Sequence, residues 1–241
     1  MLIYFIKYQK SFLITKQTVE MINKKNSDLN LCINSAKVIF WDFDGVIKES
    51  AEIKAEGFRQ LFLGFGKSFS QRVYDHHLKN QGISRDKKIA LYLSWTGALV
   101  KESLINEYCK KFSNLVFNAV LEAPWVPGVH DYILRNFKKQ NFIIVSATPK
   151  KELQKILKAL NFESYFVGVY GYPPNKSKSI RKSLKIIDVA ASNTILIGDA
   201  EEDFVAAKEN NIQFILRRTS LESDFQKTYK GLSFSDLQLE K

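Results

Sequence analysis

The chain has 241 residues, of which 45% are hydrophobic, and its formal net charge at pH 7 is +11. This length and apolar content suit one well-packed globular domain that carries a small inserted one, and they exclude a chain too polar to fold. The positive charge comes mostly from lysines scattered along the whole chain, a pattern that favours a solvated surface and anionic small molecules over a nucleic acid.

Residues 1–36 precede the first predicted strand and begin with the apolar stretch MLIYFIKYQKSFLIT. Lys7 and Lys10 interrupt this stretch, and no small-residue cleavage site follows it. We therefore expect neither a membrane span nor a signal peptide. The extension could be an added helix that packs on the domain, or Met21 could be the true start of the protein.

Short apolar runs that alternate with helical patterns predict an α/β fold. The predicted strands are almost continuously apolar, as in a parallel sheet covered on both faces. They cover residues 37–42, 142–146, 166–170, 194–198 and 212–216. The predicted helices between the later strands cover residues 128–140, 149–160, 177–190 and 200–210. This order indicates right-handed crossovers and a doubly wound parallel sheet, whose ligands bind at the carboxyl ends of the strands.

Residues 51–123 separate the first two predicted strands by far more chain than one crossover needs. Apolar residues recur there at intervals of three and four, as in amphipathic helices. We expect a helical cap domain, inserted between residues 37–50 and 124–241, which together form the core domain. The cap would fold over the active end of the sheet.

Two acids, Asp42 and Asp44, stand at the end of the first predicted strand, in the segment DFDG. The two-residue repeat of a strand places both carboxylates on one side, and Gly45 lets the backbone approach a ligand closely. Two such acids can divide the work of a nucleophile and a proton carrier. By itself the segment could equally be a turn followed by a helix cap.

Two later segments offer partners for an anion. Ser146 ends the second predicted strand, and Thr148 begins the next helix either as a plain N-cap or beside free backbone N–H groups. Lys176 and Lys178 stand near the start of another helix, where a cation opposes the helix dipole. At least one of these lysines therefore needs an anionic partner.

A second acidic segment, GDAEED, follows the fourth predicted strand. Asp199 ends the strand, and Asp203 lies one helical turn later, so both carboxylates can face one point. Together with Asp42 they would repel one another unless they shared a cation. Hard oxygen ligands with room for water and phosphate indicate Mg²⁺.

Four segments in this order resemble the motifs of the haloacid dehalogenase superfamily, in its phosphatase branch with a helical cap: DFDGV, SATP, a downstream lysine and GDAEED. The resemblance covers residues 37–216. It implies a Rossmann-like core of the kind found in phosphoglycolate phosphatase and β-phosphoglucomutase. The conjunction of four motifs is far more specific than any one of them.

The resemblance also implies roles for individual residues. Asp42 would be the nucleophile that forms an aspartyl-phosphate, and Asp44 the acid and base. Three further residues would hold the phosphoryl oxygens: Ser146, Ala147 and Lys176, with Lys178 in reserve. Mg²⁺ would be bound by the Asp42 carboxylate, the Asp44 backbone carbonyl and Asp199, with Asp203 in support.

Substrate choice should reside in the predicted cap. Arg85, in a Gly-x-Ser-Arg stretch that the resembling proteins share, is a fork-shaped donor suited to a carboxylate, a phosphate or sugar hydroxyls. It could instead be a surface or helix-stabilising residue.

We therefore predict an Mg²⁺-dependent phosphomonoester hydrolase that acts on a small phosphorylated metabolite, such as a sugar phosphate or phosphoglycolate. The alternatives are a phosphomutase of the β-phosphoglucomutase type and a non-catalytic phosphate-binding scaffold. The two cysteines are too few for a disulfide framework, which predicts a cytoplasmic protein. We expect a monomer or homodimer with no nucleic-acid or membrane partner.

Overall fold

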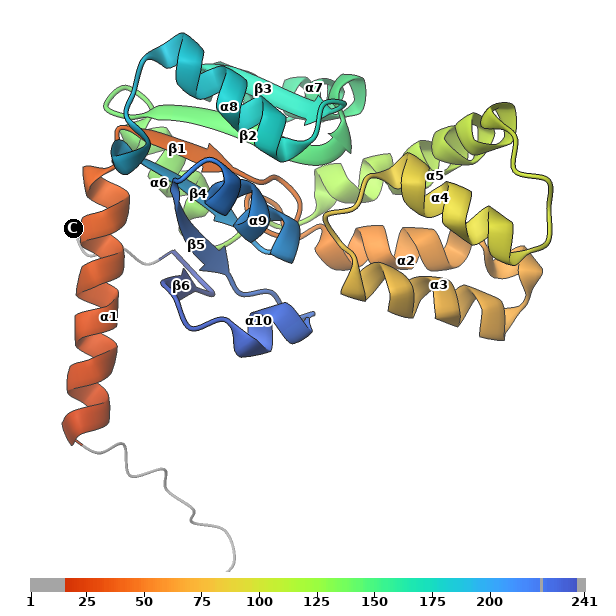
Figure 1. Ribbon diagram of the computed structural model, residues 1–241, viewed down its shortest axis with the longest axis horizontal. Coiled ribbons are helices and arrows are strands. Elements are labelled where there is room, and N and C mark those ends of the chain that lie inside the picture. Colours follow the sequence, from red (N-terminus) through yellow and green to blue (C-terminus); the bar gives the residue numbers. More distant parts are fainter. Residues whose placement is uncertain (1–15, 222, 238–241) are drawn as a thin grey trace, which may run out of the picture.

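The larger part of the protein is built around one sheet of six parallel strands in the order β3-β2-β1-β4-β5-β6 (Figure 1). The structure is a computed structural model that describes residues 16–221 and 223–237, and side chains from residue 24 onward. The strands are β1 (Val38–Trp41), β2 (Asn141–Pro149), β3 (Gly168–Tyr172), β4 (Thr194–Gly198), β5 (Gln213–Arg217) and β6 (Ser233–Phe234). The predicted α/β fold with a parallel sheet is confirmed.

Strand β1 lies at the centre of the sheet, and its four residues are all buried. It pairs with β2 on one side and β4 on the other, so that Trp41 lies level with Ile144 and Ile197. Because the three strands are parallel and in this register, their carboxyl ends meet at one edge of the sheet. The polar residues that follow each strand are thereby brought together.

Helices cover both faces of the sheet. Alternate residues of β1 belong to two hydrophobic clusters, one on each face of the sheet. Val38 and Phe40 face the first side, while Ile39 and Trp41 face the second. The helices packed on the first side are α8 (Lys176–Ile187) and α9 (Glu201–Glu209). Those on the second side are α1 (Lys16–Ser35), α6 (Val129–Asn136) and α7 (Lys150–Ala159).

Four helices between β1 and β2 form a separate group beside the sheet (Figure 1). They are α2 (Ala51–Leu61), α3 (Lys67–Lys79), α4 (Arg85–Trp95) and α5 (Glu102–Glu122). Aromatic side chains hold them together: the ring centroids of Phe58 and Phe112 lie 4.2 Å apart, and those of Phe62 and Tyr92 lie 5.6 Å apart. The helical character predicted for this stretch is thus observed.

The described part of the N-terminal extension is helix α1. Leu29 and Ile33 of this helix are buried in the core. The Gln140 side chain also donates hydrogen bonds to the carbonyls of Ile33, at 2.8 Å, and Ala36, at 2.7 Å. This helix therefore packs on the domain, whereas the apolar segment at residues 1–15 lies outside the described residues. None of the described helices is long and apolar enough to cross a membrane.

Several element boundaries differ from the prediction. Helix α8 begins at Lys176 rather than 177, because the Asn175 side chain accepts a hydrogen bond from the Lys178 N–H at 3.0 Å and caps the helix there. Strand β3 begins two residues later than predicted, after an exposed Val167. The short elements β6 and α10 (Asp224–Thr228) were not predicted, since neither is long enough to carry a periodic pattern.

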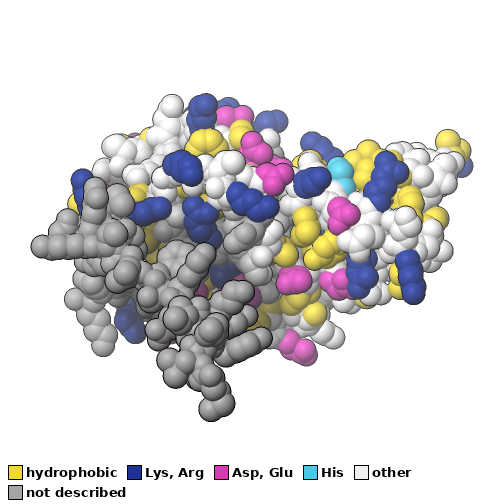
Figure 2. All heavy atoms as spheres, turned by 90° about the horizontal axis from the view of Figure 1, so that it is seen from below, with side chains coloured by type: hydrophobic (Ala, Val, Ile, Leu, Met, Phe, Trp, Pro, Cys, Tyr) yellow, Lys and Arg dark blue, Asp and Glu magenta, His cyan; other side chains and the backbone are white. Residues whose placement is uncertain are grey.

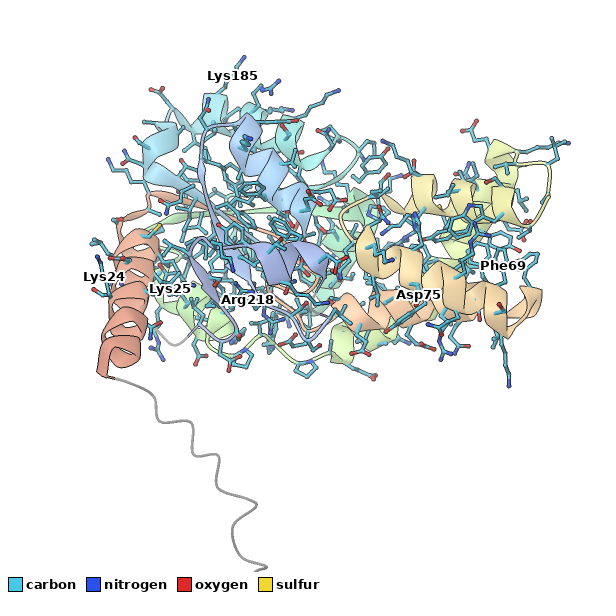
Figure 3. The ribbon with its side chains drawn as sticks, turned by 60° about the horizontal axis from the view of Figure 1, so that its bottom comes forward. Lys24, Lys25, Phe69, Asp75, Lys185 and Arg218 are labelled. Atoms are coloured by element: carbon cyan, nitrogen blue, oxygen red, sulfur yellow. The ribbon has the colours of Figure 1, made fainter. Side chains whose placement is uncertain are left out.

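Basic side chains are interspersed with other side chains on the visible part of one face of the molecule (Figure 2). In the face shown in Figure 2, lysine and arginine alternate with acidic and neutral side chains. Lys24 and Lys25 on α1 and Lys185 on α8 are exposed and point outward from the domain (Figure 3). The net charge of +11 is thus spread among the described side chains that are visible on this face.

Candidate active site

Asp42 directly follows β1 at the carboxyl edge of the sheet, and its side chain is buried there. Its Oδ1 accepts a hydrogen bond from the Phe43 N–H at 2.7 Å, and its Oδ2 lies 2.7 Å from Lys176 Nζ. Burial raises the pKa of Asp42 to about 7, although the ammonium of Lys176 acts in the opposite direction. The carboxylate is rigidly held and largely removed from water.

Lys176, the first residue of α8, lies between two acids. Its Nζ is 2.7 Å from Asp42 Oδ2 and 2.6 Å from Asp203 Oδ1. Burial alone would lower the pKa of Lys176, but these two carboxylates raise it above its ordinary value. Lys178 is exposed. The structure therefore gives the expected anionic partners to Lys176 rather than to Lys178.

Asp42, Asp199 and Asp203 form a buried acidic cluster, with one carboxylate oxygen from each lying within 4.8 Å of the others. Asp199 Oδ2 is buried and has no hydrogen-bond partner among the residues that the structure describes. Burial raises the pKa of Asp199, and the nearby carboxylates of Asp42 and Asp203 raise it further. An orphaned carboxylate oxygen beside two other acids fits a hard divalent cation such as Mg²⁺.

Asp44 belongs to a different hydrogen-bond network. Its Oδ1 accepts from the Ser50 hydroxyl at 2.6 Å, and its Oδ2 accepts from the Thr148 hydroxyl at 2.8 Å. Lys54 Nζ lies 3.5 Å from the same Oδ2. The turn that carries Asp44 out of β1 uses Gly45 at φ +78°, a conformation that favours glycine. Asp44 is thus held by neighbours that can donate or exchange protons.

The end of β2 supplies the other predicted anion-binding group. Ser146 is buried, and its hydroxyl accepts a hydrogen bond from the Thr148 N–H at 3.1 Å. The pairing of β2 with β3 is irregular between Val145 and Pro149, so the chain bends as it leaves the sheet. Thr148 does not cap helix α7; its hydroxyl turns to Asp44 instead.

A cavity of about 70 Å³ lies where this edge of the sheet meets the inserted helices. It contains seven of the eight predicted site residues: Asp42, Asp44, Arg85, Ser146, Ala147, Lys176 and Asp199. The eighth, Asp203, does not line the cavity, but its carboxylate lies 2.6 Å from the Nζ of Lys176, which does. Residues from five separate stretches of the chain therefore converge on one small space.

Arg85, at the start of α4, lines the cavity but is already paired. Its two terminal nitrogens lie 2.7 Å from the two carboxylate oxygens of Glu152 on α7. The same guanidinium donates to the Ser113 hydroxyl at 2.6 Å. This bidentate pair connects the inserted helices to the sheet domain. It uses guanidinium N–H donors that we expected to bind a substrate.

The sequence comparison decides the family. The model of the haloacid dehalogenase-like hydrolase family matches residues 38–217, which include both halves of the site. The chain belongs to this family. Its α/β core with a parallel six-stranded sheet is thus that of a haloacid dehalogenase-like hydrolase.

Individual related proteins share about a fifth of their residues or fewer with this chain. A phosphoglycolate phosphatase from Colwellia psychrerythraea is 21% identical over 196 residues, covering 76% of this chain and 84% of that protein. A putative phosphoglycolate phosphatase structure from Lactobacillus plantarum has a TM-score of 0.66 at 17% identity, covering 84% and 96% of the two chains. A β-phosphoglucomutase from Clostridium difficile has a TM-score of 0.65 at 18% identity, covering 83% and 91%.

The residues that touch the site and were not predicted include the polar side chains Ser50, Lys54, Lys88 and Glu152. Ser50 and Lys54 lie one helical turn apart at the start of α2, a spacing that could have indicated a shared face. Glu152 lies in the first turn of α7, where an acid usually does no more than favour the helix dipole. Nothing in the sequence around Glu152 indicated that its partner would be Arg85, which lies 67 residues earlier in the chain.

Proposed function

We propose that the protein is an Mg²⁺-dependent phosphomonoester hydrolase that acts on a small phosphorylated metabolite through an aspartyl-phosphate at Asp42. The observation that carries this proposal is the burial of the Asp42 carboxylate beside Lys176, in a cavity that Asp44 also lines. A nucleophile needs a fixed position, and a second carboxylate can handle the protons.

The proposed reaction has two steps. Asp42 attacks the phosphorus, the bond from phosphorus to the ester oxygen breaks, and Asp44 donates a proton to the departing oxygen. Water then attacks the phosphorus of the aspartyl-phosphate while Asp44 takes up a proton, which frees Asp42 and inorganic phosphate. Lys176 and Ser146, together with the backbone at Ala147, hold the phosphoryl oxygens through both steps.

The buried acidic cluster is the proposed metal site. The Asp42 and Asp199 carboxylates and the Asp44 backbone carbonyl would hold Mg²⁺, with Asp203 in support. When bound, the ion supplies positive charge next to the oxygens of the transferring phosphoryl group. Asp203 meanwhile keeps Lys176 in place, since their side chains are 2.6 Å apart.

We also propose that residues 51–123 act as a cap over the core formed by residues 37–50 and 124–241, with residues 1–36 as an added extension. The ion pair of Arg85 with Glu152 supports the role of a cap, because it holds the inserted helices against the sheet domain. Arg85 keeps a proposed role beside the substrate. We expect a cytoplasmic monomer or homodimer without a nucleic-acid partner.

Names of related proteins support phosphoglycolate or a sugar phosphate as the substrate class. One relative is a phosphoglycolate phosphatase, and the structure of CbbY from Rhodobacter sphaeroides with xylulose-(1,5)bisphosphate has a TM-score of 0.65. A mutase of the β-phosphoglucomutase type uses the same pair of acids. Release of inorganic phosphate without isomerisation of the substrate distinguishes the hydrolase from the mutase.

The test is a screen of small phosphomonoesters with and without Mg²⁺, run on the wild type and on Asp42→Asn. We expect Mg²⁺-dependent release of phosphate from the wild type and less than about a thousandth of that rate from the variant, because the nucleophile is lost. Asp188→Asn is the matched control, since Asp188 is exposed at the end of α8. Comparable activity in Asp42→Asn would refute covalent catalysis at this residue.

A further inference from the structure

Four lysine or arginine side chains line the cavity, and three of them have carboxylate partners within the protein. Lys176 Nζ lies 2.7 Å from Asp42 Oδ2, and Lys54 Nζ lies 3.5 Å from Asp44 Oδ2. The guanidinium of Arg85 has Glu152 as its bidentate partner. The charges of these three residues are therefore already balanced before any substrate arrives.

Lys88, on α4, is the fourth. Its side chain is buried, with 3% of the residue exposed, and it forms no ion pair with any carboxylate in the described part of the chain. Its Nζ contacts three neutral acceptors: His77 Nδ1 at 2.9 Å, the Asn80 carbonyl at 3.2 Å and the Gln81 carbonyl at 3.1 Å. These acceptors satisfy hydrogen bonds but do not neutralise a charge.

Such a buried ammonium is costly unless an anion approaches it. Burial lowers the pKa of Lys88 to about 7. The charge of Glu202 acts in the opposite direction, the cations Arg85 and Lys54 lower the pKa further, and Asp44 raises it. Burial also lowers the pKa of His77 well below its ordinary value, so its ring is neutral and brings no second charge. Acids therefore lie near enough to influence Lys88, but none in the described part of the chain forms an ion pair with its ammonium.

Lys88 lines the same cavity as the residues of the proposed phosphoryl site. Asp42 and Ser146 line it from the sheet, while His77, Gly82 and Lys88 line it from the inserted helices. Its volume of about 70 Å³ is far below the roughly 300 Å³ at which pockets for drug-sized ligands begin. A ligand whose phosphoryl group reaches Asp42 therefore has only a few further atoms before it meets the side lined by Lys88.

We propose that Lys88 is a specificity-determining residue that binds a second acidic group of the substrate, so that the preferred substrate is a short phosphomonoester with an oxyanion at its far end. This inference rests on the proposed hydrolase function. The shared chemistry is a carboxylate or a second phosphate. Either would replace one of the carbonyl acceptors of Lys88 and balance its charge.

A purely structural role for Lys88 makes a different prediction. Its contacts with the carbonyls of Asn80 and Gln81, just after α3 ends, could serve only to hold the α3–α4 connection. In that case, loss of Lys88 would weaken the turnover of all substrates together. A specificity role would instead weaken only the turnover of substrates with an acidic far end.

Three substrates that share a two-carbon backbone separate these possibilities. Phosphoglycolate ends in a carboxylate, 1,2-ethanediol bisphosphate ends in a second phosphate, and 2-hydroxyethyl phosphate ends in a neutral hydroxyl. For the wild type with Mg²⁺, we expect kcat/KM to be at least tenfold higher for one or both acidic substrates than for the neutral one. The acidic substrate with the higher kcat/KM identifies which acidic group Lys88 binds.

Variants of Lys88 then test whether this residue makes the distinction. Lys88→Met removes both charge and donors, and Lys88→Gln keeps a donor for the loop carbonyls if the first variant fails to fold. Each should reduce the preference to about one, mainly through a higher KM, with turnover of 2-hydroxyethyl phosphate kept within about threefold. Lys88→Arg should keep part of the preference. The matched control is Lys87→Met, because Lys87 is exposed on the same helix.

Equal kcat/KM for all three substrates in the wild type would overturn the inference, as would a parallel loss of all three in Lys88→Gln. Both outcomes leave phosphatase activity intact in the wild type and therefore do not affect the proposed function. Failure of the wild type to hydrolyse any phosphomonoester with Mg²⁺ would instead refute the proposed function itself. The two failures are thus distinguishable in one set of assays.

Discussion

The carboxylate of Asp42 and the ammonium of Lys176 lie 2.7 Å apart, and both side chains are buried. The contact joins the end of the central strand to the start of α8. Because each group offsets the charge of the other in a site with little water, the position of the proposed nucleophile depends on the lysine.

Replacement of Lys176 should damage both activity and stability. In Lys176→Met, Asp42 and Asp203 lose the cation that lies within 2.7 Å of each. We expect at least a hundredfold lower kcat on any accepted phosphomonoester and a free energy of unfolding lower by about 3 kcal/mol, as for other broken buried ion pairs. Steady-state kinetics and urea unfolding measure the two effects.

Lys178→Met is the matched control for this change, since Lys178 is exposed two residues later on the same helix. Its kinetics and unfolding should equal those of the wild type. If Lys178→Met lost as much activity as Lys176→Met, the assignment of Lys176 as the phosphate-binding lysine would be wrong.

Mg²⁺ should stabilise the protein against heat. Binding to the buried acids relieves their mutual repulsion, and an ion at about a hundred times its dissociation constant adds about 2.7 kcal/mol of stability. We expect the unfolding temperature to rise with Mg²⁺ and fall again with a chelator, as measured by differential scanning calorimetry. Asp199→Asn should abolish the response, while Asp188→Asn should retain it. A full response in Asp199→Asn would place the metal elsewhere.

Gly45→Ala should reduce activity through Asp199. Gly45 adopts φ +78°, and a Cβ at this position would collide with Asp199 Oδ2. Gly97 also has φ +78°, but a Cβ there would meet no other atom within 4 Å. Both alanine variants should lose about 1 kcal/mol of stability from backbone strain. Only Gly45→Ala should lower kcat and weaken the Mg²⁺ response; equal kinetics in the two variants would contradict this.

Glu152 should make stability depend on pH in the acidic range. Burial by itself would raise the pKa of Glu152, but the hydrogen bonds from Arg85 and the charge of Lys54 outweigh it and lower the pKa from 4.5 to about 2. The ionised carboxylate therefore contributes stability that is fully present above about pH 4.5 and is lost as the pH falls toward about 2. This contribution is at most about 3 kcal/mol.

Urea unfolding of the wild type and Glu152→Gln at several pH values measures this contribution. The difference in free energy of unfolding should be largest at pH 7 and should fall to less than half at about pH 3. Glu163→Gln, at an exposed position, should show no such trend. A difference that stays constant from pH 7 to pH 3 would show that the charge of Glu152 does not stabilise the fold.

Much of the site could be predicted because the chemistry stands where strands end. Apolar runs identify β1 and β4, and parallel strands that share a register must bring Asp42 and Asp199 to one edge. The one-turn spacing of Asp203 from Asp199 likewise predicted a shared direction, and the carboxylates do meet. These relationships are local, or they follow from the periodicity of the chain.

Other relationships could not be predicted, because they join segments that are distant along the chain. Arg85 was expected to face a substrate, yet its donors reach Glu152 on α7. Lys88 resembles any other lysine of a helix until the packing of α3 against α4 buries it. The choice between Lys176 and Lys178 was also left open, and the contacts of Lys176 with Asp42 and Asp203 favour Lys176.

The sequence by itself thus determined the α/β fold, the order of the acidic motifs and the edge of the sheet to which they belong, since each follows from hydrophobic periodicity and short-range spacing. Only the tertiary structure decided which charges are balanced within the protein and which basic group in the cavity lacks a carboxylate partner among the described residues. Charge balance depends on distances between side chains from different elements, and those distances are set when the inserted helices pack against the sheet.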